Sequence, residues 1–358
     1  MLEMSQIEPR LAHWLGAPVA HLRVLASGWE TTVFEFAIAR RSPSRPAIPP
    51  GRALVLRSYD GDRADKGARE HLTIDRLSVA GYCVPRQFGF EPDPAPLGAP
   101  FLIMERAPGG PLFTTRSFAE AFATFSQGFF AFVRAQVRLH RLDPARPDLA
   151  DIPRSCMPAD APAATPLLDR VLATIAERIE RGPLPGLKDA YHRLAARAGA
   201  FRTAPNSLLH MDYHPLNVLV RGFRVTAVID WVNADAGDRH LDAGMTAAIL
   251  SSSALERPRW IRDNPIGNSL RASFAGLYFP LYDAMAPVDL ERLRYCEAVA
   301  ALLRLSMLGM MRARGAESVG FRAGAIDEIT PGVVRLLSRY VARKSGAPVR
   351  LDLAPVAA

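Results

Sequence analysis

The first hundred residues carry a strand pattern in their hydrophobic positions. Apolar and polar side chains alternate within residues 32–38, with Phe34, Phe36 and Ile38 on one face, and this alternation predicts a half-buried strand. A loop rich in proline and serine then leads to a second apolar run at residues 53–57. Two such runs joined by one loop predict a hairpin.

A helical pattern follows this hairpin. Glu70 and Ile74 share one face of residues 65–80, and Gly81 is well placed to end a helix there. Residues 101–105 form a further strand-like apolar run after a turn-rich segment. The pattern therefore predicts a small sheet that carries one helix.

The pattern changes after the segment Ala-Pro-Gly-Gly at residues 107–110, where we place a boundary between two lobes. Beyond it, apolar residues at three- and four-residue steps predict a long helix that ends at His140. Further helices are predicted over residues 167–200 and from Asp289, a capping residue type, to Arg314. The buried stripe of the long helix is predicted to be Phe122, Phe125, Phe129, Val133 and Val137.

The predicted fold class is α+β in two lobes. The division is residues 1–107 for the N-terminal lobe, 108–345 for a larger helical C-terminal lobe, and 346–358 for a frayed tail. A chain of 358 residues, 49% of them hydrophobic and 22% charged, is long enough for two lobes with buried cores.

Composition excludes several classes of protein. No apolar run approaches the roughly 20 residues that cross a bilayer, and no basic stretch followed by an apolar one marks a secretory signal at the start. Three cysteines without a CxxC pair give no disulfide framework and no zinc site. The net charge of +8 is spread along the chain, whereas nucleic-acid binders concentrate theirs. We expect a cytoplasmic protein that binds neither membrane nor nucleic acid.

The most unusual stretch is residues 207–231. Two short apolar segments flank a tight polar turn, which predicts a hairpin preceded by a loop that carries His210, Asp212 and Asn217. A hairpin returns its end close to its beginning, so Asn217 and Asp230 can share one cation, and their oxygens are the type that Mg²⁺ binds. Asp212 would lie alongside, free to orient or deprotonate an acceptor hydroxyl.

This motif resembles a known family. His-x-Asp-x-x-x-x-Asn, followed thirteen residues later by Asp, is similar to the catalytic loop and metal-binding Asp of protein kinases. The form His-Met-Asp-Tyr-His-Pro-Leu-Asn, with Ile-Asp-Trp and Gly-Asp-x-x-x-Asp after it, is more similar to that of the aminoglycoside phosphotransferases, a family of small-molecule kinases. Further markers of the family occur in the expected order, namely Gly28 to Phe34, Arg69-Glu70, Phe101 to Gly109 and Leu139 to Pro144.

The resemblance implies a bilobal protein-kinase-like fold, with a small antiparallel sheet and one main helix in the first lobe. It implies that Asp212 is the catalytic base and that Asn217 and Asp230 bind the Mg²⁺ that bridges the ATP phosphates. His210 and Asp242 would brace the catalytic loop.

The resemblance also implies the nucleotide contacts of the first lobe. Glu70 would pair with Arg57 on the neighbouring strand. Backbone groups of Ser27 and Gly28 would cover the phosphates. Backbone groups of Glu105 and Ala107 would hold the adenine, and the side chain of Met104 would line the back of the adenine pocket. The nucleotide is ATP, with GTP left open.

Four positions depart from the family pattern. Arg57 stands where kinases carry Lys, and its planar fork is not an equivalent of an ammonium group. Gly28 is the one glycine of a loop that in kinases has three. Met211 and Leu216 stand where the family usually has glycine, and they crowd the loop without removing a reacting group.

Three functions stay open at this point. The leading one is ATP- and Mg²⁺-dependent transfer of the γ-phosphate to a hydroxyl of a small molecule, by a monomer or homodimer. Arg57 and the single glycine favour the second, a non-catalytic, pseudokinase-like nucleotide-binding protein. The third is a protein kinase, against which the short interval between Asp230 and Asp242 argues.

The sequence also indicates the chemical class of the acceptor and the environment of three histidines. The helical lobe has more basic than acidic residues, which argues against a polycationic acceptor, although a local acidic patch could include Asp235, Glu256, Asp263 and Asp283. A neutral, partly apolar acceptor would suit Leu277, Tyr278, Phe279, Tyr282 and Tyr295. We expect His140 to be a hydrogen-bonded core residue, His214 to be structural, and His240 to be exposed.

Overall fold

The chain forms two compact units. The computed structural model describes residues 4–59, 63–113, 118–154, 162, 165–203, 206–252 and 265–351. The first unit comprises Met1–Gly109, Pro147–Pro153 and Thr226–Val232, and the second comprises Gly110–Arg146, Arg154–Val225 and Asn233–Ala358. The first unit thus includes two short segments from the part of the chain that the sequence pattern assigns to the helical lobe.

An antiparallel sheet with the strand order β1-β2-β3-β5-β4 forms the centre of the first unit. Its strands are β1 (Val19–Ser27), β2 (Thr31–Ile38), β3 (Leu54–Tyr59), β4 (Gln87–Glu91) and β5 (Phe101–Glu105). The predicted hairpin is confirmed, because β2 and β3 pair with Phe34 opposite Leu56. Sequence reasoning missed β1 and β4. The residues of β1 are mostly exposed, so this strand lacks the alternation that marks a half-buried one.

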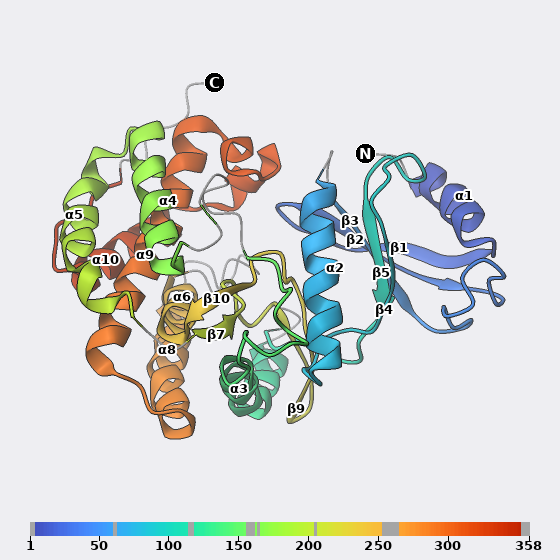
Figure 1. Ribbon diagram of the computed structural model, residues 1–358, viewed down its shortest axis with the longest axis horizontal. Helices are drawn as coiled ribbons and strands as arrows, with labels where there is room; N and C mark the ends of the chain where they lie inside the picture. Colours follow the sequence, from blue (N-terminus) through green and yellow to red (C-terminus); the bar gives the residue numbers. More distant parts are fainter. Residues whose placement is uncertain are drawn as a thin grey trace. The chain divides into compact units, whose positions relative to one another are not determined.

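Two helices cover the sheet, although the pattern predicted one. Helix α1 (Met4–Leu15) and helix α2 (Ala64–Val79) lie on opposite sides of it (Figure 1). Helix α1 buries Ile7, Leu11 and Leu15 in the core that also contains Phe34. Helix α2 ends where predicted, and Gly81 follows it with a φ of 72°, a left-handed conformation that glycine adopts without strain.

The second unit is mainly helical, and its centre is a long helix, α9, that is buried over most of its length. The predicted cap is confirmed, since the Asp289 side chain accepts hydrogen bonds from the backbone N–H groups of Glu291 and Arg292. The α-helices are α3 (Phe118–His140), α4 (Leu167–Arg181), α5 (Lys188–Arg197), α6 (Arg239–Ser252), α8 (Pro265–Met285), α9 (Leu290–Arg314) and α10 (Pro331–Ser345). Short 3-10 helices are η1 (Pro185–Leu187), η2 (Ala198–Phe201), η3 (Ala316–Val319) and η4 (Ala323–Glu328).

The predicted helix over residues 167–200 is interrupted. Helix α4 ends at Arg181, and a short turn and η1 separate it from α5. Within the described residues, no helix combines the length and apolarity needed to cross a membrane. The predicted frayed tail lies partly outside the described residues, and within residues 346–351 the backbone N–H of Arg350 donates to the carbonyl of Gly186.

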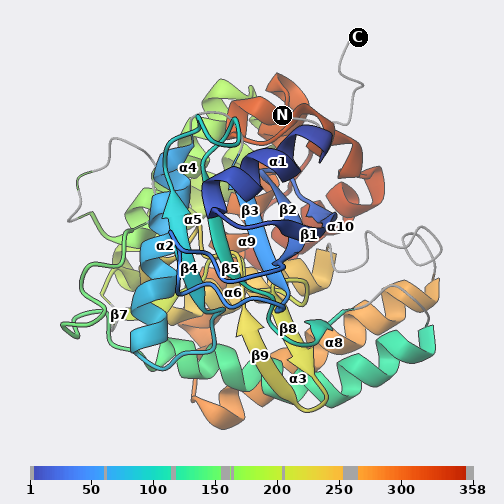
Figure 2. The same cartoon turned by 90° about the vertical axis from the view of Figure 1, so that its right-hand side faces the viewer.

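Helices α3 and α8 run side by side (Figure 2), and Phe125 stacks on Phe274 between them. The predicted stripe of α3 is buried except at Phe122, which is 54% exposed. The prediction that Tyr278, Tyr282 and Tyr295 suit an acceptor pocket is wrong, because all three side chains are buried in the core. Periodicity could not separate these aromatic core residues from pocket residues.

Two small sheets carry the motif found in the sequence. Strand β7 (Asn206–Leu209) pairs with β10 (Asp235–Asp238), and β6 (Gly110–Pro111), β8 (Val218–Arg221) and β9 (Arg224–Val228) follow one another in a three-stranded sheet. The predicted hairpin of β8 and β9 and the loop before it are therefore present.

The close packing of α6 against α9 gives a testable prediction. A Cβ atom on Gly244 would meet the backbone of Glu297 at 2.7 Å, whereas one on Gly276 of α8 would meet nothing within 4 Å. We expect Gly244→Ala to lower the thermal unfolding midpoint by several degrees, since overpacking costs about 1–3 kcal/mol. Gly276→Ala, the control, should leave it unchanged or raise it, because alanine is the better helix former. A Gly244→Ala protein that unfolds at the wild-type temperature would contradict this packing.

Candidate active site

In the first unit, a buried arginine joins two carboxylates. Arg57 lies on β3, and its Nη2 donates to Oδ1 of Asp230 at 2.7 Å. Its Nε lies 3.2 Å from Oε2 of Glu70 in an ion pair that lacks hydrogen-bond geometry. Burial alone would lower the pKa of Arg57, but Asp230 and Glu70 outweigh it and raise that pKa above its usual value, so the guanidinium stays charged.

Glu70 connects three segments of this unit. It is buried on α2, where the pattern predicted it, and the expected pair with Arg57 is present. It also accepts hydrogen bonds from the hydroxyl of Tyr59 at 2.6 Å and from the backbone N–H of Trp231 at 3.2 Å. Sequence reasoning missed Tyr59, although its position two residues after Arg57 places it on the same face of β3.

Asp230 has an unusual backbone. Its φ is 69°, in the left-handed region that a non-glycine residue enters at a cost of about 1 kcal/mol or more. The next residue, Trp231, is buried, donates from Nε1 to the carbonyl of Val228, and packs edge-on against Tyr82. The Asp230 side chain keeps 31% exposure, and within the described residues no protein group forms a hydrogen bond with its second oxygen, Oδ2.

The turn between β1 and β2 holds the residues predicted to cover phosphates. Ser27 pairs with Thr32, and the N–H of Gly28 donates to the carbonyl of Thr31 at 3.0 Å. Lys66, in the first turn of α2, forms an ion pair of 2.9 Å with Glu30 and so ties the turn to that helix. Sequence reasoning did not single out this lysine.

The residues predicted to hold adenine lie at the end of β5. Met104 is buried and stands opposite Val55 of β3. The N–H of Glu105 donates to the carbonyl of Arg86 at 2.8 Å, and the carbonyl of Ala107 accepts a hydrogen bond from the Arg106 side chain at 2.9 Å.

In the second unit, the loop between β7 and β8 brings Asp212 and Asn217 together. Nδ2 of Asn217 donates to the backbone carbonyl of Asp212 at 3.0 Å and lies 3.4 Å from its Oδ2. Nε2 of His214 lies 3.6 Å from the same Oδ2. Burial opposes ionisation of Asp212, but His214, Arg304 and His210 together hold its pKa below the usual value.

A buried carboxylate, Asp242 of α6, fixes this loop. Its Oδ1 accepts the backbone N–H of Met211 at 2.6 Å, and its Oδ2 accepts from Nε2 of Gln136 at 3.0 Å and lies 2.8 Å from Nε2 of His140. Nδ1 of His210 accepts the N–H of Asp212 at 3.3 Å. The expectation that His210 and Asp242 brace the loop is confirmed.

The loop backbone explains one departure from the family pattern. Met211 has a φ of 62°, a conformation that favours glycine. Asp242 holds this conformation through the Met211 N–H, so the methionine is tolerated at a cost of about 1–2 kcal/mol.

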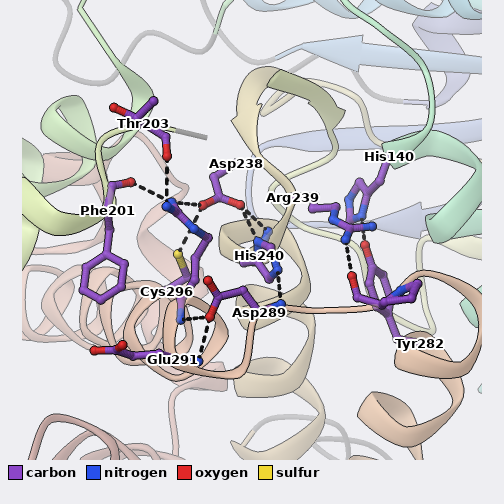
Figure 3. Close-up of polar contacts among 12 residues, drawn as sticks. His140, Phe201, Thr203, Asp238, Arg239, His240, Tyr282, Asp289, Glu291 and Cys296 are labelled. Carbon is purple, nitrogen blue, oxygen red and sulfur yellow. Dashed lines mark hydrogen bonds and ion pairs between the residues drawn. The ribbon is translucent and has the colours of Figure 1, made fainter. Parts of the chain in front are cut away.

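The other histidine and acidic predictions have mixed outcomes. His140 is the expected core residue and also contacts the hydroxyl of Tyr282 at 2.6 Å. His240 is buried, not exposed, and its two ring nitrogens contact Asp238 and the backbone N–H of Asp289 (Figure 3).

The predicted acidic patch is not supported. Asp235 is buried and bonded to both terminal nitrogens of Arg170, at 2.7 and 2.8 Å, so it is not open to an acceptor. Asp283 is exposed and accepts the N–H of Val288, while Glu256 and Asp263 lie outside the described residues.

The fold and the family follow from comparison with known proteins. The chain matches the model of the phosphotransferase enzyme family over residues 21–304 and belongs to that family. Its fold is similar to that of aminoglycoside phosphotransferase APH(4)-Ia (18% identity, 96% of this chain and 100% of the other, TM-score 0.64). It is also similar to that of macrolide 2'-phosphotransferase MphH from Brachybacterium faecium (17% identity, 90% and 97%, TM-score 0.56). The predicted kinase-like α+β fold is confirmed, and comparison with curated proteins finds no match.

The network around Asp242 predicts a pH dependence of stability. Burial opposes ionisation of Asp242, but His140, His210 and Gln136 hold its pKa below the usual value. Its charged form therefore stabilises the fold above the unfolded pKa of about 4, and this contribution is lost as the pH falls through the lower folded value.

We expect Asp242→Asn to lower the thermal midpoint at pH 7, with a difference from wild type that narrows below pH 4. Asp65→Asn is the control, because that carboxylate is 69% exposed in a weak surface pair, and it should change the midpoint little at any pH. A difference for Asp242→Asn that stays constant from pH 7 to pH 3 would contradict the assignment.

Proposed function

We propose that the protein is an ATP- and Mg²⁺-dependent O-phosphotransferase that transfers the γ-phosphate to a hydroxyl of a small molecule. The pairing of Asp212 with Asn217 on a braced loop carries this proposal. An ionised carboxylate beside a potential metal ligand is what phosphoryl transfer requires, because that reaction depends on positioning and charge neutralisation. Membership of the phosphotransferase family supports it.

Asn217 and Asp230 fit the role of Mg²⁺ ligands. The amide nitrogen of Asn217 faces Asp212, which leaves its amide oxygen for a cation. Asp230 keeps Oδ2 without a protein partner in the part of the chain that is described. Amide and carboxylate oxygens are ligands that Mg²⁺ takes together with substrate phosphates. When bound there, Mg²⁺ would neutralise charge on the β- and γ-phosphates.

Asp212 would act as the general base. It accepts the proton of the acceptor hydroxyl while that oxygen bonds to the γ-phosphorus. The bond from the γ-phosphorus to the bridging oxygen breaks in the same step, and ADP leaves with its electron pair. The lowered pKa of Asp212 keeps the carboxylate ionised near neutral pH, as this role requires.

The first unit would hold the nucleotide. We assign the adenine to Met104, Glu105 and Ala107, and the phosphates to Ser27, Gly28 and Arg57, with Glu70 as the partner of Arg57. Arg57 and Glu70 act mainly by fixing Asp230, since the guanidinium is shared by both carboxylates. A variant of APH(4)-Ia, which has a similar fold, forms a ternary complex with AMP-PNP and hygromycin B, so this fold can hold a nucleotide and a small acceptor together.

One observation favours a second candidate, a nucleotide-binding protein without transfer activity. Arg57 is engaged by Glu70 and Asp230, whereas the usual Lys pairs with one carboxylate and contacts phosphate. Binding of ATP without transfer to any acceptor would favour this candidate.

Replacement of the proposed base tests the leading candidate. Asp212→Asn should reduce phosphate transfer by about 10²- to 10⁴-fold, the range that a general base supplies, and should change ATP affinity little. Transfer is measured as ADP release with a panel of hydroxylated acceptors that includes aminoglycosides and macrolides, and ATP affinity by calorimetry. Asp65→Asn, a carboxylate that is 69% exposed, serves as the control. Undiminished transfer by Asp212→Asn would overturn the assignment of the base.

A further inference from the structure

His214 has a defined tautomer beside the proposed base. The backbone N–H of Leu216 donates to its Nδ1 at 3.2 Å, so Nδ1 carries the lone pair. In the neutral ring the proton then lies on Nε2. That Nε2 is the atom that lies 3.6 Å from Oδ2 of Asp212, so His214 directs a donor at the carboxylate.

Two donors approach the same oxygen of Asp212. Nδ2 of Asn217 lies 3.4 Å from Oδ2, on which His214 also converges. Among the described residues, no protein group forms a hydrogen bond with Oδ1. The backbone beside Asp212 is fixed as well, because Tyr213 is buried and its hydroxyl donates to the carbonyl of Phe132 at 2.7 Å. Rotation of the Asp212 side chain is therefore the main freedom left at this position.

We propose that His214 is a positioning residue that, with Asn217, holds Oδ2 of Asp212 and so presents Oδ1 to the acceptor hydroxyl. This inference rests on the proposed function and assigns the proton of the hydroxyl to Oδ1. Contacts in active sites are commonly longer in the free protein and shorten when the substrates bind, and the 3.6 Å separation needs only a small movement to become a hydrogen bond.

The competing interpretation is purely local. If the only contribution of His214 were to accept the Leu216 N–H, any side chain with an acceptor in the place of Nδ1 would replace it. The two interpretations therefore differ in which ring nitrogen matters. Glutamine and asparagine separate them, because the amide nitrogen of Gln can take the place of Nε2, while the carbonyl oxygen of Asn takes the place of Nδ1.

The experiment compares His214→Gln, His214→Asn and His214→Ala with the wild type. We expect His214→Gln to retain most of kcat, and His214→Asn and His214→Ala to lose about 10- to 100-fold, as for small misplacements of a catalytic group. KM for ATP and the ATP dissociation constant should stay unchanged in all three. The thermal midpoints of the variants check that each one is folded.

The outcomes separate this inference from the proposed function. Transfer by His214→Asn at the wild-type rate, or a loss in His214→Gln as large as in His214→Asn, would overturn the positioning role while the proposed function stands. If the His214 variants changed KM and left kcat at the wild-type value, that result would also overturn the positioning role. A wild-type protein that binds ATP but transfers phosphate to no acceptor would overturn the proposed function and this role with it.

Discussion

The first unit depends on how one buried guanidinium is neutralised. Arg57 is enclosed by the sheet and α2, and an unpaired charge there would cost several kcal/mol, so Glu70 and Asp230 must both stay beside it. These pairs join β3, α2 and the segment after β9. Glu70 also accepts the backbone N–H of Trp231, the residue next to Asp230, whose own φ is in the left-handed region. Arg57 donates a hydrogen bond to Asp230 and forms an ion pair with Glu70 through a different nitrogen, whereas a lysine has a single compact ammonium group. Arginine at this position therefore favours a rigid Asp230.

The second unit also depends on a buried charge, in this case the carboxylate of Asp242. Asp242 collects donors from α3 and from the loop before β8, and one of them is the backbone N–H of Met211. This contact stabilises the positive φ of Met211. The loop therefore adopts its conformation without the glycine that is usual in the family. Asp212 and Asn217 then follow at fixed positions. In both units, a buried charge with several partners determines the backbone on which a proposed functional residue lies.

Local sequence patterns predicted many of the secondary-structure elements and the loop of the candidate site. They missed features that depend on contacts between distant residues. The β2–β3 hairpin, the cap of α9 and the loop with Asp212 carry strong short-range signals and are present. Helix α1 has only three buried residues and an internal proline, so its pattern was weak. His240 looked exposed because one of its partners, the backbone N–H of Asp289, lies far away in the sequence, although the other, Asp238, is only two residues away. The two partners of His214, the N–H of Leu216 and the carboxylate of Asp212, lie in the same loop, but a sequence pattern does not show which ring nitrogen faces each of them.

The central claim is that this chain binds a nucleotide together with Mg²⁺, and thermal unfolding tests it most directly. The midpoint of the purified protein is measured with Mg²⁺ alone, with ATP alone and with both. A ligand at 100 times its dissociation constant stabilises the folded state by about 2.7 kcal/mol, which raises the midpoint by a few degrees. We predict such a rise with ATP that depends on Mg²⁺. No change with ATP or GTP in the presence of Mg²⁺ would contradict the account.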